Sequence, residues 1–143
     1  MQIRKNITGI KMEPLEIVNK YLSIIFKENK KGEGLGDVLA ENFIFDDPFT
    51  TARSSNEFIS KSKVWIETNK SLQMEKQFVD GNSVFCRYVI CINNFEGKLV
   101  SFQLADYFEI ERDRIVKERV FFFDQVGFAK EMGFINEYLK KYL

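Results

Sequence analysis

The stretch Phe102-Gln-Leu-Ala-Asp-Tyr-Phe-Glu-Ile110 alternates along its length, so that Phe, Leu, Asp, Phe and Ile would share one side of a strand. Period-two alternation of this kind predicts a strand with one face in a hydrophobic core. The stretch belongs to one of four strand-like runs, at about 72–79, 83–93, 98–111 and 114–123. Short turn sequences separate these runs, which predicts an antiparallel meander.

Helical patterns lie on both sides of the meander. Apolar residues recur at helical spacing behind Pro14, which predicts a helix from Pro14 to about Asn29. We expect a short helix at about 35–40 and a longer one at about 56–69, capped by Ser54 or Ser55. The tail at about 125–143 favours two helical pieces with a break near Gly133. Helices before strands indicate an α+β fold with N-terminal helices packed on a mostly antiparallel sheet.

Length and charge indicate a single soluble domain. The chain has 143 residues, of which 1–11 are expected to form a flexible leader and 12–143 one domain. Lys plus Arg and Asp plus Glu are both 21, so we expect no nucleic-acid partner. No apolar run is long enough for a bilayer, so we expect no membrane partner and a cytoplasmic location. Cys86 and Cys91 would lie on opposite faces of one strand and are not expected to pair.

The chain contains no histidine. This removes Ser-His and Cys-His nucleophile pairs and the commonest ligand of zinc or copper. Acids do not cluster at metal-ligand spacing and no Gly-rich phosphate loop follows a strand, so we expect neither a metal nor another cofactor. The 15 Phe residues indicate either a large apolar cavity or interface, or simply a Phe-rich core.

Three polar residues fall on faces that the patterns assign to the interior. Asp106 lies in the apolar stripe of its strand, and Asp47 shares a face with Phe43, Phe45 and Phe49. Tyr21 joins the buried stripe of the first helix. Buried polar groups of this kind need hydrogen-bond partners, so we expect the three side chains to point inward together.

This arrangement has a catalytic interpretation and a structural one. A neutral Asp106 beside the Tyr21 hydroxyl could form an oxyanion hole, while an ionised Asp47 takes a proton from a carbon next to a carbonyl. Alternatively, a hydrogen bond between Tyr21 and Asp106 only satisfies two core groups, and Asp47 only caps the turn before the helix at Asn56.

Two segments resemble a known family. They are Ala40-Glu-Asn-Phe-Ile-Phe-Asp-Asp-Pro48 with the helix after it, and the strand at 102–110 with the following turn and Ile115-Val-Lys-Glu118. Over roughly 15–127 the chain resembles the SnoaL-like group of the nuclear transport factor 2-like superfamily. The resemblance implies a cystatin-like, cone-shaped α+β barrel with a strongly curved sheet and a buried apolar pocket.

The same resemblance implies roles for individual residues. Ketosteroid isomerase, within that superfamily, has a Tyr on the first helix, an Asp directly before Pro and an Asp on a later strand, and Tyr21, Asp47 and Asp106 look like the matching positions. SnoaL-like polyketide cyclases also use an acid at a place resembling Asp106, but with a helping His that this chain lacks. The expected contacts to a small hydrophobic ligand come from Trp65, Phe45, Phe102, Phe108 and Tyr88.

Further residues allow predictions about what the two faces of the sheet contact. Arg87 and Glu118 each share a face with apolar neighbours, so they either form a buried or interfacial pair or have no functional role. Phe121, Phe122 and Phe123 cannot all face inward, which leaves at least one on the outer face and predicts a homodimer.

Three functional hypotheses follow. The first is an isomerase- or cyclase-type enzyme that moves a proton next to a carbonyl. The second is a non-catalytic carrier or sensor of a small apolar ligand, and the third is a protein-interaction module whose sheet binds a partner. The coincidence of Tyr21, Asp47 and Asp106 favours the first, because a carrier has little use for a charged base in an apolar pocket.

Overall fold

The computed structural model describes residues 12–26 and 31–142. The predicted helices and the four-stranded meander occur in the predicted order, and two further strands lie between the second and third helices. The helices are α1 (Pro14–Phe26), α2 (Leu35–Val38), α3 (Ser55–Lys61), α4 (Lys63–Glu67), α5 (Gln125–Glu131) and α6 (Ile135–Tyr142). The strands are β1 (Leu39–Asp46), β2 (Thr51–Ala52), β3 (Lys70–Asp80), β4 (Ser83–Asn93), β5 (Leu99–Glu111) and β6 (Arg114–Phe122). The predicted leader at 1–11 and the predicted end of the first helix near Asn29 lie outside the described residues.

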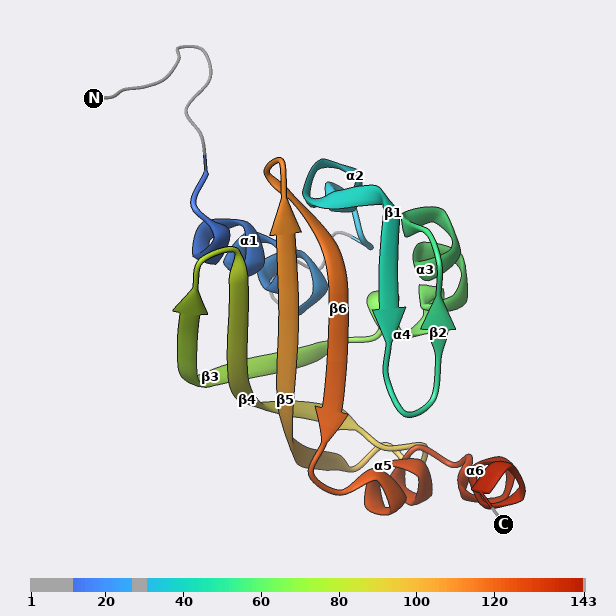
Figure 1. Cartoon of the computed structure of the whole chain (residues 1–143). Coiled ribbons are helices and arrows are strands. Elements are labelled where there is room, and N and C mark those ends of the chain that lie inside the picture. Colours follow the sequence, from blue (N-terminus) through green and yellow to red (C-terminus); the bar gives the residue numbers. More distant parts are fainter. Residues whose placement is uncertain (1–11, 27–30, 143) are drawn as a thin grey trace.

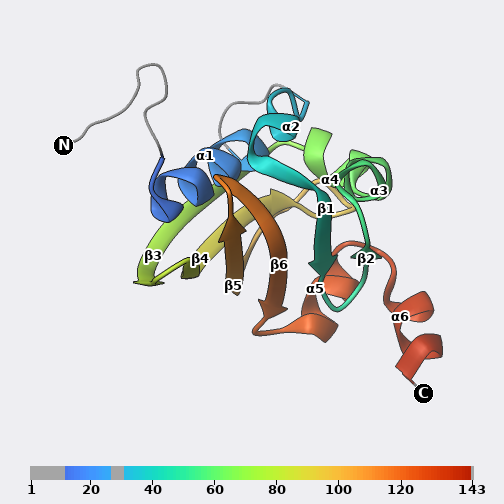
Figure 2. The ribbon, with the colours of Figure 1, turned by 45° about the horizontal axis from the view of Figure 1, so that its top comes forward.

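All six strands form one curved sheet in the order β2-β1-β6-β5-β4-β3. The meander from β3 to β6 is antiparallel, as predicted, whereas β1 runs parallel to β6. The lower parts of β3, β4 and β5 bend strongly, and α1 to α4 lie along one side of the sheet (Figures 1 and 2). α5 and α6 close its lower end (Figure 1). The result is the expected cone-shaped α+β fold.

Two β-bulges interrupt the alternation in the antiparallel part of the sheet. One extra residue, Glu75, stands between the pairs Met74↔Tyr88 and Lys76↔Arg87. A second, Val116, stands between Ile115 and Lys117, which pair with Ile110 and Glu109. A bulge bends its strand and shifts the faces of the residues beyond it.

The bulge in β6 changes which residues face inward. Simple alternation puts Val116 on the same face as Glu118, but Ile115 is the residue buried on that side and Val116 is only half-buried. Ile115 and Glu118 are therefore both turned into the core. An acid is thus placed inside the barrel.

The core lies between α1 and the inner face of the sheet and is rich in aromatic rings. Tyr21 on α1 meets Phe108 of β5 edge to face, with ring centroids 5.7 Å apart. Phe58 of α3 packs on Phe43 of β1 at 5.3 Å in the same manner. Such edge-to-face pairs add stability to that of the buried area, and they tie the helices to the strands.

Local sequence explains where the helices begin and end. The helix predicted at 56–69 is two helices, α3 and α4, which meet at Ser62. The Ser54 side chain caps α3 by accepting a hydrogen bond from the backbone N–H of Glu57 at 3.0 Å. Cys86 and Cys91 are unpaired thiols, as predicted. None of the helices within 12–26 and 31–142 is long and apolar enough to cross a membrane.

Replacing the cap should destabilise the fold measurably. Ser54→Ala leaves an N–H of the first turn of α3 without its acceptor, so the free energy of unfolding should fall by about 1 kcal/mol. Urea denaturation followed by Trp65 fluorescence would measure it. The matched control is Ser60→Ala, an exposed position later in α3, which should change the value by less than about 0.5 kcal/mol. Equal effects of the two substitutions would contradict the assigned cap.

Candidate active site

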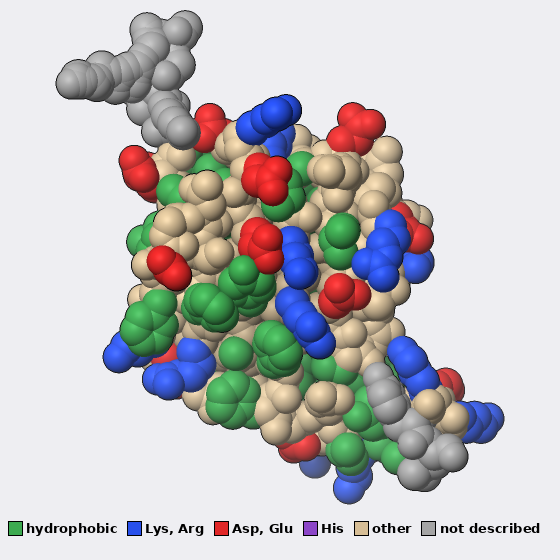
Figure 3. Space-filling model, in the orientation of Figure 1, with side chains coloured by type: hydrophobic (Ala, Val, Ile, Leu, Met, Phe, Trp, Pro, Cys, Tyr) green, Lys and Arg blue, Asp and Glu red, His purple; other side chains and the backbone are tan. Residues whose placement is uncertain are grey.

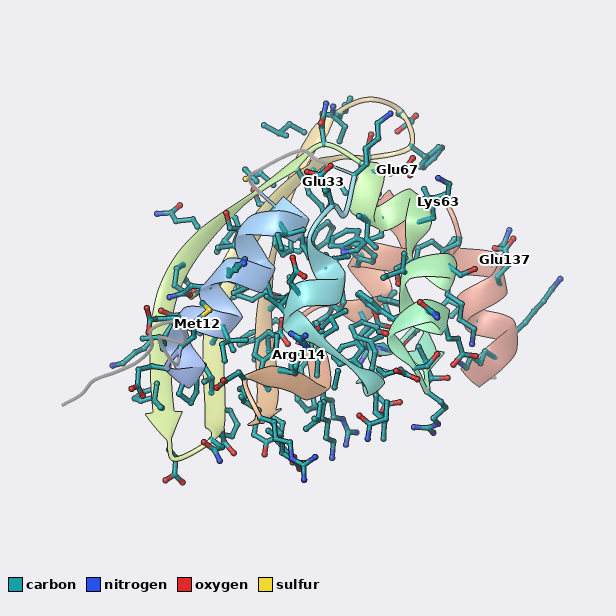
Figure 4. The ribbon with its side chains drawn as sticks, turned by 90° about the horizontal axis from the view of Figure 1, so that it is seen from above. Met12, Glu33, Lys63, Glu67, Arg114 and Glu137 are labelled. Carbon is teal, nitrogen blue, oxygen red and sulfur yellow. The ribbon has the colours of Figure 1, made fainter. Side chains whose placement is uncertain are left out.

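A cavity of about 360 Å³ lies between α1, the inner face of the sheet, and the helices α3 to α5. Figure 4 shows from above the side chains that extend between these elements, with Lys63, Glu67 and Glu137 on the outside of the helices. The walls are mainly aromatic and are formed by Phe45, Phe49, Phe58, Trp65, Phe122, Phe128 and Phe134. A cavity of this composition suits a small and largely apolar molecule.

One end of the cavity holds a hydrogen-bonded pair from α1 and β6. The Tyr21 hydroxyl donates to Oε1 of Glu118, and both side chains line the cavity while being almost fully buried, with 3% of each exposed. We call this the deep end of the cavity. Glu118 pairs with the fully buried Phe108 across β5 and β6, so it lies on the inner face of the sheet.

Asp106 lies directly behind Glu118 on the neighbouring strand. It is 1% exposed and does not line the cavity, and its Oδ2 accepts a hydrogen bond from the Tyr88 hydroxyl at 2.7 Å. A side-chain hydrogen bond links the Asp106 and Glu118 carboxyls. The other Asp106 oxygen, Oδ1, has no hydroxyl, amine or amide donor in the described part of the chain. A proton held between the two carboxyls gives this oxygen its partner.

Burial controls the titration of this pair. Desolvation raises the pKa of Asp106 to about 7, although hydrogen bonds from Glu118 and Tyr88 lower it. Desolvation and then the charge of Asp106 raise the pKa of Glu118 well above its ordinary value. Two carboxylates this close in an apolar core cannot both be ionised cheaply, so the pair keeps a proton at neutral pH.

Asp47 lines the cavity from the turn between β1 and β2. Its Oδ1 accepts hydrogen bonds from the backbone N–H groups of Phe49 at 2.7 Å and Thr50 at 2.6 Å. Burial raises the pKa of Asp47 to about 6, while the two backbone hydrogen bonds lower it. Asp47 therefore does cap a turn, as the structural interpretation expected, but it also faces the cavity.

The structure brings some of the expected site residues together and separates others. Tyr21, Asp47, Tyr88, Trp65 and Phe45 all line the cavity. The other two expected ligand contacts, Phe102 and Phe108, do not. Phe108 is fully buried against Tyr21, and the ring of Phe102 packs on that of Phe128 at 5.1 Å.

The predicted partner of Tyr21 was wrong, because its hydroxyl bonds to Glu118 and not to Asp106. Of the two alternatives given for Arg87 and Glu118, the pair between them does not form. Arg87 is exposed and its Nε lies 3.2 Å from Oε1 of Glu75, whereas Glu118 is buried. Glu118 was thus missed as a residue of the site. The signal was present, since the rule that singled out Asp106 also placed Glu118 beside Val120 and Phe122.

Sequence comparison finds no match, but structural comparison finds proteins of similar fold. No known family model matches the chain, and no curated protein matches it in sequence. An NTF2-like protein of unknown function from Cytophaga hutchinsonii is 21% identical with a TM-score of 0.65, over 83% of this chain and 97% of that one. A candidate SnoaL-like polyketide cyclase from Jannaschia is 15% identical with a TM-score of 0.69, over 93% and 99%. A candidate isomerase of the SnoaL-like family from Agrobacterium tumefaciens is 18% identical with a TM-score of 0.62, over 76% and 95%.

The chain has the nuclear transport factor 2-like fold. At these identities the likeness shows the fold and no more, because a fold hosts many activities. The part of the chain described by the structure contains no group of three or more His, Cys, Asp or Glu side chains that could hold a metal ion.

The buried carboxyl pair should make stability depend on pH. Because the folded-state pKa values of Asp106 and Glu118 lie above their ordinary values, the folded protein keeps protons that the unfolded chain releases above about pH 4. The free energy of unfolding should therefore fall as pH rises from about 4 to about 7, by about 1.4 kcal/mol per pH unit for each such proton.

Glu118→Gln should make this slope shallower, since it removes one of the two titrating groups. Urea denaturation at a series of pH values would measure the slope. The matched control is Asp80→Asn, which removes an exposed carboxyl at the end of β3 and should leave the slope unchanged. A wild-type stability that is flat across this range would contradict the shared proton.

Proposed function

We propose that this protein binds a small, largely apolar ring compound in the cavity and moves a proton on a carbon next to its carbonyl group. The observation that carries the proposal is Asp47, a carboxyl in an aromatic cavity whose pKa is raised to about 6. Such a carboxyl is mostly ionised at pH 7 and is a stronger base than an ordinary Asp. The Tyr21–Glu118 pair provides polar atoms at the deep end.

The proposed step needs no external reactant. Asp47 takes the proton from the substrate carbon, the C–H bond breaks, and its electron pair moves onto the carbonyl oxygen to give an enolate. Asp47 then returns the proton to another carbon of the same molecule, which gives an isomerised product. The enolate oxygen is stabilised by hydrogen bonding at the deep end, where the aromatic walls exclude water.

The fold comparison supports this class of reaction without deciding it. Two of the similar structures are a candidate polyketide cyclase and a candidate isomerase of the SnoaL-like family. Proton transfer next to a carbonyl is general acid–base chemistry that fits either kind of enzyme. The absence of histidine favours isomerisation over a cyclase mechanism that uses a His. The alternative is a non-catalytic carrier, which the aromatic walls would serve equally well.

The substitution Asp47→Asn distinguishes the proposed enzyme from a non-catalytic carrier. The amide can still accept the two backbone hydrogen bonds but cannot take a proton, so proton transfer should fall by about 10²- to 10⁴-fold. Conversion of flat β,γ-unsaturated cyclic ketones into their conjugated isomers, followed by NMR, would measure it. The matched control is the neighbouring Asp46→Asn, which should keep most of the activity because Asp46 does not line the cavity. Undiminished isomerisation by Asp47→Asn would overturn the proposed base.

We also propose that the outer face of the sheet packs against a second copy of the chain in the cytoplasm. Hydrophobic side chains gather on this face (Figure 3), and they include the exposed rings of Phe78 (59%), Phe85 (49%) and Phe121 (46%). Acidic and basic side chains share the face, with Glu75 paired to Arg87 and Glu109 to Lys117. A face that carries both charges beside apolar rings suits contact with a copy of itself.

The free thiols Cys86 and Cys91 support a reducing compartment.

Phe85→Asp should convert this dimer into a monomer. A carboxylate in the middle of the apolar face would have to be desolvated on association, which costs several kcal/mol. Sedimentation velocity at micromolar concentration would report the change. Val64→Asp, an equally drastic substitution on α4 at an 81% exposed position, is the control and should stay dimeric. A wild-type protein that sediments as a monomer would refute the dimer outright.

A further inference from the structure

The deep-end cluster consists of Tyr21, Tyr88, Asp106 and Glu118. When its two carboxyls share one proton, every hydroxyl and carboxyl proton of the cluster lies in a hydrogen bond between two of its members. The Tyr21 hydroxyl donates to Glu118, and the Tyr88 hydroxyl donates to Asp106. The remaining proton lies in the hydrogen bond between the two carboxyls. No donor is then left over for a molecule in the cavity.

This count of protons determines which hydrogen bonds the deep end can form with a ligand. Tyr21, Tyr88 and Glu118 all line the cavity, and their oxygen atoms still have lone pairs. In the one-proton form these atoms can accept hydrogen bonds from a ligand hydroxyl or amine but cannot stabilise a carbonyl or enolate oxygen. A second proton on the pair supplies the missing donor.

The charged groups around the Asp106–Glu118 pair do not alter this count of protons. Cys86 of β4 faces Asp106, and Asp47 faces both acids from the β1–β2 turn. The basic residue of the cavity wall, Lys61, is engaged elsewhere, with its Nζ 2.8 Å from the Thr51 carbonyl oxygen and 3.3 Å from Glu57. Lys141 of α6 acts on Asp47. The pair therefore carries its charge without a cation beside it in the described contacts.

We propose that the Asp106–Glu118 pair decides which class of ligand the deep end binds, according to the number of protons that it holds. With one proton it selects ligands that donate a hydrogen bond, such as phenols, alcohols or amines. With two protons it selects ligands that accept one, such as ketones and enolates. Glu118 is the member that contacts the ligand, and Asp106 is a positioning residue behind it.

This inference rests on the proposed function for the use of the cavity, and it adds a second titrating centre to that site. Catalysis as proposed needs Asp47 ionised and the pair doubly protonated. Asp47 is ionised above about pH 6, and the pair takes its second proton below about pH 7. Proton transfer should therefore be confined to a narrow range near pH 6 to 7.

The test compares two flat probes of similar size, 1-tetralone, which only accepts a hydrogen bond, and 2-naphthol, which donates one. Isothermal titration calorimetry at pH 8 in buffers of different ionisation enthalpy counts the protons taken up on binding. We expect tetralone to take up close to one proton per site and neutral naphthol to take up none. Tetralone affinity should fall about tenfold per pH unit above about pH 7, while naphthol affinity should not.

Two variants and a control assign the effect to the pair. In Glu118→Gln the amide supplies a donor at every pH, so tetralone binding should lose both its proton uptake and its dependence on pH above 7. Asp106→Asn should lose the uptake as well, although it does not touch the ligand. Asp47→Asn is the control and should retain the uptake, because Asp47 is already ionised at pH 8.

Each outcome has a distinct meaning. Equal proton counts for the two probes in the wild-type protein, or uptake that persists in Glu118→Gln, would overturn the inference and leave Asp47-dependent proton transfer standing. Failure of both probes to bind would overturn the cavity as a ligand site, and with it the proposed function and this inference. The wild-type measurement alone decides the matter if either variant fails to fold.

Discussion

The structure depends on how two carboxyl groups are kept inside an apolar barrel. An isolated carboxylate in such a core is very costly, because water no longer solvates its charge. Here the problem is reduced in two ways: Asp106 and Glu118 share a proton, and one tyrosine hydroxyl donates to each of them. Tyr21 comes from α1 and Tyr88 from β4, so the pair also connects the first helix to three neighbouring strands.

The β6 bulge and the regular pairing of β6 with β5 together decide which side chains enter the core. Glu118 and Val120 pair with Phe108 and Asp106, so they lie on the inner face of the sheet. The extra residue, Val116, bends the strand and turns Ile115 inward together with Glu118. Without the bulge, Ile115 and Glu118 would lie on opposite faces, and one of them would leave the core. The acid at the deep end is therefore flanked along β6 by apolar side chains on both sides.

Much of the fold could be predicted because it depends on local sequence patterns. The turns that separate β3 to β6, the cap at Ser54 and the inward side of β5 all depend on neighbouring residues. The parallel pairing of β1 with β6 and the bulges depend on contacts between distant segments, so no local pattern reveals them. The prediction of the candidate site had the same limit, because part of it depends on contacts between distant segments. Alternation found Asp106, but the partner of Tyr21 depends on the register across strands.

The choice between a carrier and an enzyme comes down to why position 47 holds an acid. The turn itself does not require one, because an Asn could accept the same hydrogen bonds from Phe49 and Thr50. An ionised Asp at this position is destabilising, since its pKa is raised from 3.8 to about 6 and each unit costs about 1.4 kcal/mol at neutral pH. A carrier of neutral apolar molecules would gain nothing from that cost. A base that must be poised near neutral pH requires it, and this asymmetry is the strongest physical reason to regard the cavity as catalytic.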